Sequence, residues 1–173
     1  MPNSKSGISI VVKIIFLLSI IIIIASGLIL FDVFHEKDSN ESYYFNNISF
    51  DYPADWEIGD NSNFDVTLED LTNANALNIK KIDSEGYSLD IIAENISRES
   101  TGFDSVFMYK NITSVNNQRA YDIGAKLNVD GGYYTRMLVF LDENELYIFV
   151  FTCDNLEDLN SDYEVIKNSI KIK

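Results

Sequence analysis

The apolar run IIFLLSIIIIIASGLILF, from Ile14 to Phe31, constrains this chain most, because it contains no charged residue. A helix over this run would be about 27 Å long, which matches the ~30 Å hydrocarbon core of a bilayer. Isoleucine is a weak helix former in water, but a single segment in lipid must satisfy its own backbone hydrogen bonds, and a helix does so. We therefore predict that residues 14–34 form a transmembrane anchor.

The charges on either side of the run predict its orientation. Lys5 and Lys13 precede it, whereas acids dominate the residues that follow it closely. By the positive-inside rule, residues 1–13 are cytoplasmic and the chain after the span lies outside the cell membrane. The short polar segment 35–42 is then a tether, and residues 43–173 form one extracytoplasmic domain.

Two other interpretations of the N-terminus stay open. The small residues Ala-Ser-Gly at 25–27 have the form of a signal-peptide cleavage site, although the apolar run continues beyond them. A pilin-like subunit is the second, in which a short leader is cleaved near Ser6 or Gly7 and the apolar helix packs into a filament. Lys13 stands where such subunits usually carry an acid, so we favour an uncleaved anchor.

The net charge of the segment after the span restricts its partners. Residues 32–173 carry 11 Lys and Arg against 27 Asp and Glu, a net charge of −16. Such a charge opposes binding to nucleic acid and to anionic lipid head groups, because both need a positive partner. We therefore expect a soluble, monomeric domain that meets the bilayer only through its N-terminal helix and binds an unidentified protein partner. The single cysteine, Cys153, cannot form an internal disulfide and is expected in the core at the end of a strand.

Alternation of apolar and polar residues predicts a series of β-strands. The expected strands cover 43–45, 48–52, 64–68 (a short edge strand), 76–82, 106–115, 118–127, 133–141 and 146–153. Turn sequences at 116–117, 130–132 and 142–145 join the last four of these strands as hairpins. The stretch LYIFVF at 146–151 is apolar on both faces, which is typical of a central strand in a sheet covered on both sides.

Two helices complete the predicted domain. Residues 88–99 have apolar side chains at i, i+3, i+4 and i+7, with Ser88 as the cap. A closing helix over 161–170 is expected to begin with a capping box formed by Ser161 and Glu164. Hairpin-connected strands with two helices indicate an α+β domain built around an antiparallel sheet.

Four stretches of the chain together resemble the PsbP-like family. They are ISFDYPADWEI at 48–58, ITSVNNQRAYDI at 112–123, LYIFVF at 146–151 and YEVIKNSIKI at 163–172. The similarity runs in order through nearly all of 43–172, with Asn117 where the family often has glycine. It implies an antiparallel sheet with helices on both faces and a small membrane-anchored relative of archaeal type. Nothing resembles the photosystem-binding extension of the family's namesake, an extrinsic subunit of photosystem II, so a photosynthetic role is not implied.

The domain lacks the residues of the common catalytic and metal sites. The one histidine, His35, lies in the tether, which removes Ser-His-Asp, Cys-His and the usual zinc arrangements from the domain. Gly131 and Gly132 form a hairpin turn with no phosphate-binding loop around them. Carboxylates abound, but no spacing selects a glycosidase pair. We expect no enzymatic activity, and we assign no catalytic, cofactor-binding or metal-binding residue.

The acids at the start of the closing segment are the best calcium candidates. They are Asp154, Glu157, Asp158 and Asp162. The Asp-x-Asp-x-Asn-Gly grammar of a calcium loop is absent, so we interpret them as helix-capping and solvated acids.

Four asparagines begin N-x-S/T sequons. They are Asn40, Asn47, Asn95 and Asn111. Glycosylation is open at those that are exposed and irrelevant at any that face inward.

Trp56 follows the proline that ends the strand at 48–52, and it has two interpretations. We expect it to fold back as a structural plug against the closing helix, with ligand stacking in a surface groove as the alternative. For the whole chain we predict a membrane-anchored, non-enzymatic binding or accessory module, with the pilin-like subunit as the alternative.

Overall fold

A computed structural model describes residues 40–101, 105–128 and 132–173 of the chain. The predicted span at 14–34 and its cytoplasmic segment lie outside the described residues, as does Gly131 of the predicted turn. Within the described ranges, no helix is both long enough and apolar enough to cross a bilayer.

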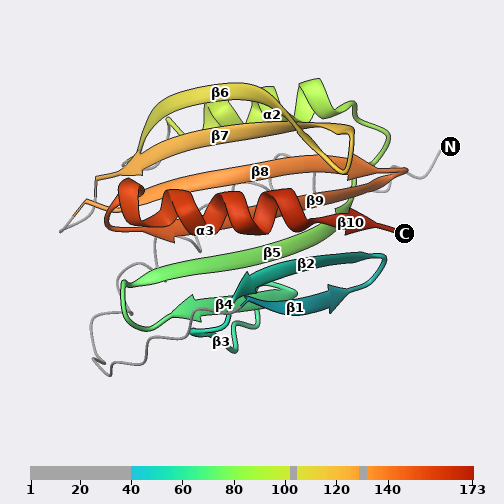
Figure 1. Cartoon of the computed structure of the whole chain (residues 1–173). Helices are drawn as coiled ribbons and strands as arrows, with labels where there is room; N and C mark the ends of the chain where they lie inside the picture. The colour runs from blue at the N-terminus through green and yellow to red at the C-terminus, as the bar shows by residue number, and fades with distance from the viewer. Residues whose placement is uncertain (1–39, 102–104, 129–131) are drawn as a thin grey trace, which may run out of the picture.

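Ten strands and two helices make up the described domain. In chain order they are β1 (Asn40–Phe45), β2 (Ile48–Pro53), β3 (Trp56–Ile58), β4 (Val66–Asp70), β5 (Asn75–Asp83), α2 (Leu89–Glu99), β6 (Ser105–Val115), β7 (Gln118–Leu127), β8 (Tyr134–Asp142), β9 (Glu145–Cys153), α3 (Leu156–Ser169) and β10 (Lys171–Ile172). Seven strands form one sheet in the order β3-β4-β5-β9-β8-β7-β6, and β1, β2 and β10 form a second. Every pair of neighbouring strands is antiparallel. The prediction of an antiparallel sheet with two helices is confirmed (Figure 1).

Strand β9 lies at the centre of the seven-stranded sheet, between β5 and β8, as its apolar sequence predicts. Its side chains point alternately into two clusters of buried hydrophobic residues. Tyr147, Phe149, Phe151 and Cys153 belong to the first core cluster. Leu146, Ile148 and Val150 belong to the second core cluster. All seven are at most 1% exposed, so this strand is buried on both faces, and Cys153 ends it in the core as expected.

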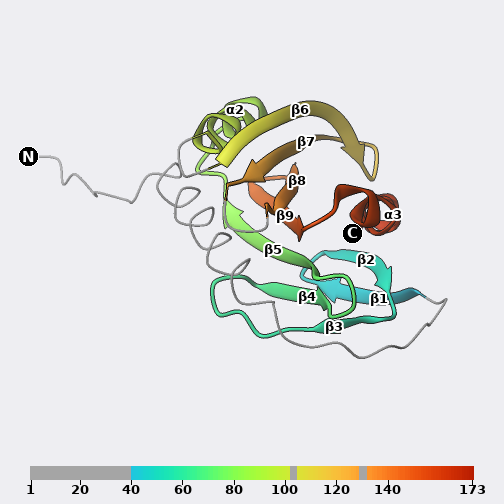
Figure 2. The same ribbon diagram turned by 90° about the vertical axis from the view of Figure 1, so that its left-hand side faces the viewer.

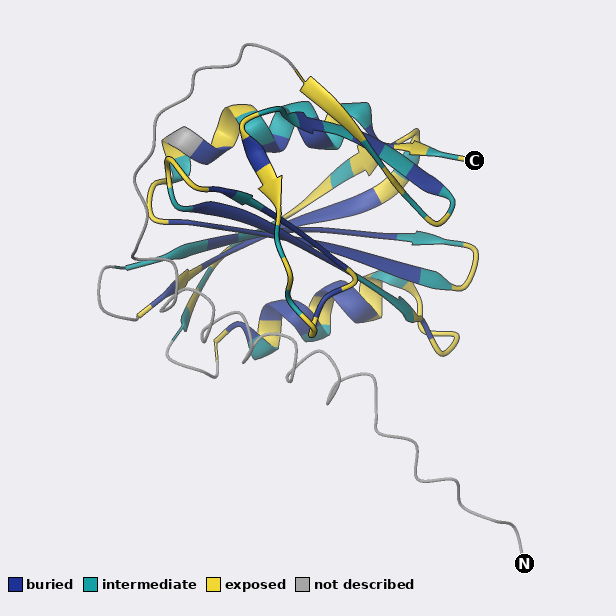
Figure 3. Ribbon diagram, turned by 90° about the horizontal axis from the view of Figure 1, so that it is seen from below, coloured by how far each residue is buried: buried dark blue, intermediate teal, exposed yellow. Residues whose placement is uncertain are grey.

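The two clusters are completed by different elements. The first core cluster receives Ile48 and Phe50 from β2 and Tyr163 and Ile166 from α3. The second core cluster receives Ile92, Ala93 and Ile96 from α2. Figure 2 shows α3 lying between the curved large sheet and the strands β1 and β2. In Figure 3 the buried residues follow the central strands of the large sheet.

Helix α2 begins as the sequence predicts. The side chain of Ser88 accepts a hydrogen bond from the backbone N–H of Ile91 at 3.4 Å. Asp90 in the first turn and Arg98 in the last turn complement the helix dipole.

The predicted start of the closing helix is wrong. Helix α3 begins at Leu156, with Asn155 accepting a hydrogen bond from the N–H of Glu157 at 3.0 Å. Leu156 and Leu159 pack on the first core cluster, so the apolar face of the helix starts earlier than the predicted capping box at Ser161.

Two strand predictions also need correction. The segment predicted as an edge strand forms β4, which lies inside the sheet because the unpredicted strand β3 pairs with it. Strand β3 has only three residues, which is too short for alternation to show in the sequence. Strand β1 begins at Asn40, so residues 40–42 of the predicted tether belong to it.

Strand β6, at the edge of the sheet, has an irregularity in its pairing with β7. The pairing register shifts between Phe107 and Tyr109. Phe107 therefore packs on the second core cluster, whereas the ring of Tyr109 lies over Gly124. A Cβ at Gly124 would lie 2.2 Å from Cε1 of Tyr109, which no side chain could accept without displacing the ring.

Trp56 is 4% exposed and lies in the first core cluster, the environment that the plug hypothesis requires. We expect Trp56→Ala to lower the free energy of unfolding by ~3–5 kcal/mol, because it empties a buried aromatic site. Urea unfolding of the full chain in detergent, followed by far-UV circular dichroism, measures this loss. Ile58→Ala in the same strand is the control, because Ile58 is 66% exposed and should change stability by about 0.5 kcal/mol or less. Equal stabilities for the two variants would contradict the plug.

Candidate functional site

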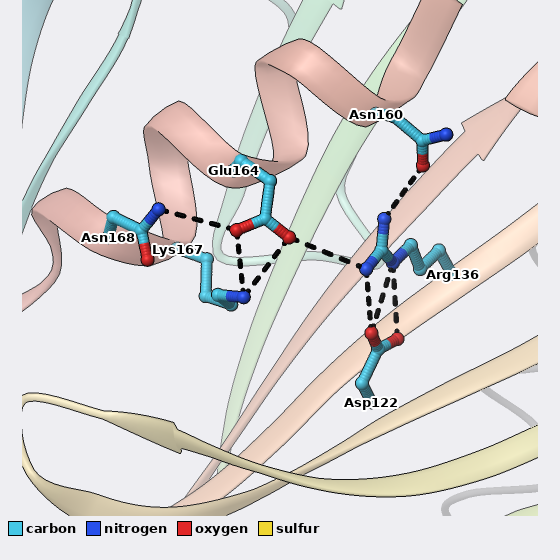
Figure 4. Close-up of polar contacts among 6 residues, drawn as sticks. All are labelled: Asp122, Arg136, Asn160, Glu164, Lys167 and Asn168. Carbon is cyan, nitrogen blue, oxygen red and sulfur yellow. Dashed lines mark hydrogen bonds and ion pairs between the residues drawn. The ribbon is translucent and has the colours of Figure 1, made fainter. Parts of the chain in front are cut away.

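A concentrated set of polar side chains lies between α3 and the large sheet (Figure 4). We call it the arginine cluster. Its members are Asp122 of β7, Arg136 of β8, and Asn160, Glu164 and Lys167 of α3. Arg136 lies two residues from Leu138 along β8, and Asp122 lies two residues from Ala120 along β7. Since Leu138 and Ala120 belong to the first core cluster, Arg136 and Asp122 project from the same face as that cluster.

Arg136 is the centre of the arginine cluster. Its Nη2 donates to Oδ2 of Asp122 at 2.7 Å, and its Nε lies 3.2 Å from both carboxylate oxygens. Its Nη1 donates to Oδ1 of Asn160 at 2.9 Å, and Nη2 lies 3.7 Å from Oε1 of Glu164. The side chains of Arg136 and Asp122 are 14% and 10% exposed. The guanidinium thus joins two strands to α3 at a site that is largely shielded from solvent.

Two tyrosines surround this pair. Cζ of Arg136 lies 3.4 Å from the ring centroid of Tyr163, a close cation–π contact. Burial raises the pKa of the Tyr163 phenol. Burial, with a contribution from the charge of Asp122, raises the pKa of Tyr109 to about 12. Both phenols therefore stay protonated at neutral pH and cannot act as bases there.

The charges of the arginine cluster compensate one another. Burial alone would raise the pKa of Glu164, but the ammonium of Lys167 and the guanidinium of Arg136 hold that pKa below its usual range. Nζ of Lys167 lies 2.9 Å from Oε2 of Glu164. Two cations thus face two carboxylates, and each charge has a partner. This arrangement is suited to fastening α3 to the sheet, and it offers no unpaired charged group to a substrate.

Among the residues that the structure describes, potential metal ligands do not lie close together. No group of three or more His, Cys, Asp or Glu residues there could hold a metal ion. Asp154 and Glu157, two of the predicted calcium candidates, are exposed at the start of α3, and the side chain of Asp158 lies outside the described set.

A polar depression of about 490 Å³ lies at one end of the domain. It is lined by Asn46, Asn47, Lys81, Asp142, Glu143, Glu145 and Lys173. Nζ of Lys81 lies 3.3 Å from Oε1 of Glu145. The side-chain amide of Asn47 donates to Asp142, and its oxygen accepts from the hydroxyl of Tyr147. Asn47 therefore contributes to holding the β1–β2 turn against the β8–β9 turn.

A second polar set lies at the surface, where α2 crosses the edge of the sheet. We call it the α2–β6 seam. Its members are Asp90 and Glu94 of α2, Lys110 and Ile112 of β6, and Arg119 and Tyr121 of β7. The hydroxyl of Tyr121 donates to Asp90, and Nη2 of Arg119 lies 2.8 Å from Oδ1 of Asp90. One turn further along α2, Glu94 pairs with Lys110.

Apolar side chains are exposed beside the charge pairs of the seam. Ile112 lies opposite Tyr121 in the ladder and is 66% exposed. Ile91, the neighbour of Asp90 in the chain, is 49% exposed. Strand β6 carries a single charged residue, Lys110, in a strongly acidic domain. Aliphatic, tyrosine and arginine side chains beside paired charges are typical of protein-binding surfaces.

Sequence reasoning did not find either polar set. Asp90 and Arg119, or Asp122 and Glu164, are far apart in the chain, and their pairing depends on how the helices lie on the sheet. One signal was present for the seam: Asp90 and Glu94 are four residues apart on the predicted helix 88–99, so they share one face.

Comparisons with known proteins define the fold of the chain. No protein-family model matches it, and no curated protein sequence matches it. Solved structures do: cyanobacterial PsbP (CyanoP) from Synechocystis sp. PCC 6803 has a TM-score of 0.61 and 14% identity, over 84% of this chain and 99% of that one. LpqN of Mycobacterium tuberculosis, described as involved in cell envelope biogenesis, has a TM-score of 0.57 and 10% identity, over 78% and 91% of the two chains.

A more distant structure extends the comparison. The Ran-binding protein Mog1p of Saccharomyces cerevisiae has a TM-score of 0.52 and 4% identity, over 73% of this chain and 82% of that one. The chain therefore has the PsbP-like fold. At these identities the likeness defines the fold alone.

The arginine cluster makes a strong prediction for stability. We expect Arg136→Met to lower the free energy of unfolding by ~3–5 kcal/mol, because it leaves Asp122 buried without its partner. The double variant Arg136→Met/Asp122→Leu removes both charges and should lose less. Lys110→Met, which breaks an ion pair with an exposed glutamate, is the control and should cost about 1 kcal/mol or less. Urea unfolding of the full chain in detergent measures all three, and a double variant less stable than Arg136→Met would contradict this account.

Proposed function

We propose that the protein is a membrane-anchored, extracytoplasmic binding or accessory module that receives a protein partner on the α2–β6 seam. The PsbP-like fold supports an accessory or binding role, since solved structures with this fold include one named as a Ran-binding protein. That partner belongs to the yeast protein and is not carried over.

The exposure of Ile112 is the observation that carries the proposal. An isoleucine that is 66% exposed, flanked by the Lys110–Glu94 and Arg119–Asp90 pairs, gives an apolar centre with a polar rim. The domain around it is acidic. A complementary partner therefore presents an apolar patch bordered by basic residues, and its basic rim would steer the encounter.

The paired state of the arginine cluster supports a non-enzymatic role. Its carboxylates face Arg136 and Lys167, and the raised pKa values of Tyr109 and Tyr163 keep both phenols protonated. The seam is likewise made of paired charges and apolar side chains. Paired charges, protonated phenols and apolar side chains are suited to binding a partner rather than to catalysing a reaction.

The membrane placement rests on the sequence of residues 1–39. We expect the chain to stay in the membrane fraction after carbonate washing, and protease added to whole cells to remove a tag placed after Lys173. Release of the intact chain, or a protected tag, would contradict the placement. N-terminal sequencing of the extracted protein checks the uncleaved anchor against cleavage near Ser6 or at 25–27.

A matched pair of variants checks the partner surface. Ile112 and Ile58 are both 66% exposed, and they lie in the strands at the two opposite edges of the same sheet. Ile112→Asp should reduce chemical crosslinking to a protein partner in native membranes at least tenfold, because it places a charge in the apolar centre of the seam. Ile58→Asp should leave crosslinking unchanged. Equal crosslinking by both variants, at comparable levels of folded protein, would place the partner elsewhere.

A further inference from the structure

The four sequons differ in whether the asparagine side chain and the Ser or Thr hydroxyl are already hydrogen-bonded. In the sequon at Asn47, both the amide and the oxygen of the asparagine are hydrogen-bonded, to Asp142 and Tyr147. A glycan on that amide nitrogen would break the contact between the two turns. This sequon is therefore closed in the folded protein.

The sequon at Asn95 is closed for a different reason. It lies in helix α2, and Oδ1 of Asn95 accepts from Nη2 of Arg98 at 3.1 Å. The sequon hydroxyl belongs to Ser97, which is 8% exposed and donates to the carbonyl of Ala93 at 2.8 Å. An acceptor sequon must present its amide and its hydroxyl together to the transferase, and here the hydroxyl is buried.

The sequon at Asn40 is exposed but has its hydroxyl occupied. Oγ of Ser42 donates to Oδ1 of Asp51, on the paired strand β2, at 2.6 Å.

In the sequon at Asn111, both the asparagine amide and the hydroxyl of Thr113 are available. Asn111 is exposed on β6, and Thr113 is partly exposed. Of the four sequons, this is the one in which neither the amide nor the hydroxyl is hydrogen-bonded to a described residue. Strand β6 is extended and lies at an edge of the large sheet, where, among the strands that the structure describes, it pairs with β7 alone. An enzyme can therefore approach it from the free side.

The same strand has a feature that needs protection. A long edge strand with unpaired backbone groups is a template for aggregation, and most proteins cover or charge such edges. Strand β6 has 11 residues and one charge, and it exposes Val106, Met108 and Ile112. A bulky hydrophilic group at Asn111, near the middle of this edge, would block pairing with another strand.

We propose that Asn111 carries an N-linked glycan that covers the free edge of the large sheet. The proposal rests on the proposed placement of the domain outside the membrane. Asn111 lies opposite Asp122 in the ladder and Ile112 opposite Tyr121, so the two side chains leave on opposite faces. The glycan and the α2–β6 seam therefore do not compete for the same face.

The chemistry is a glycosyl transfer from a lipid-phosphate-linked oligosaccharide, supplied by a membrane transferase of the cell. The nitrogen of the Asn111 amide forms a bond to the anomeric carbon of the sugar. The bond between that carbon and the donor's phosphate oxygen breaks, the lipid phosphate leaves with the electron pair of that bond, and the amide nitrogen loses one proton to the solvent. The product is a neutral N-glycosidic linkage.

Peptide mass spectrometry of the full chain, purified from the membranes of its own cells, tests the proposal. The peptide with Asn111 should carry glycan mass, and the peptides with Asn47 and Asn95 should be bare in the same sample. Thr113→Ser should keep the modification, and Thr113→Val should abolish it. A bare Asn111 peptide, or a glycan on Asn47 or Asn95, would overturn the assignment.

Two further measurements separate this proposal from the proposed function. Protease access to the tag after Lys173 reports the placement of the domain independently of any glycan, so a bare Asn111 in an accessible domain fails this proposal alone. Light scattering of the purified protein reports the protection of the edge. Asn111→Gln should raise the aggregated fraction severalfold and Asn95→Gln should not; equal fractions would overturn the protective role.

Discussion

The structure depends on the burial of strand β9 on both faces. Its residues alternate between two core clusters, and each of the two helices packs on a different one of them. A strand of this kind fits the centre of a sheet, where other elements cover it on both faces. Placing β9 in the centre fixes β5 and β8 beside it, and the hairpins then extend the sheet outward to β3 and β6. The second sheet, formed by β1, β2 and β10, covers the part of the first core cluster that α3 does not cover.

The sequence predicted those parts of the fold that short-range patterns control. Strand β7 has the predicted bounds, the Asn116–Asn117 turn has the positive φ angles that asparagine tolerates, and Ser88 caps α2. Each follows from alternation, turn chemistry or capping over a few residues. The start of α3, the pairing of β3 and the separation into two sheets depend on contacts between distant segments. No local pattern contains that information.

The same division holds for the polar sites. Seen in the sequence, Arg136 is one cation in a strand, and nothing near it identifies Asp122 or Glu164 as its partners. The sheet register and the position of α3 bring them together. The result joins three elements through one planar guanidinium, which can use its donors in several directions at once. A lysine at the same position could not span these partners while lying over the ring of Tyr163.

The irregularity in β6 has a consequence for assembly. Because the register shifts between Phe107 and Tyr109, β6 is divided into a shorter ladder at 105–107 and a longer one at 109–115, which are out of step by one residue. A straight strand from another molecule that aligned with the longer ladder would meet the shorter one with its donors and acceptors mismatched. Ordered pairing of another strand along the whole of this edge is therefore interrupted at Met108, and the backbone conformation of β6 itself limits how far such pairing can extend.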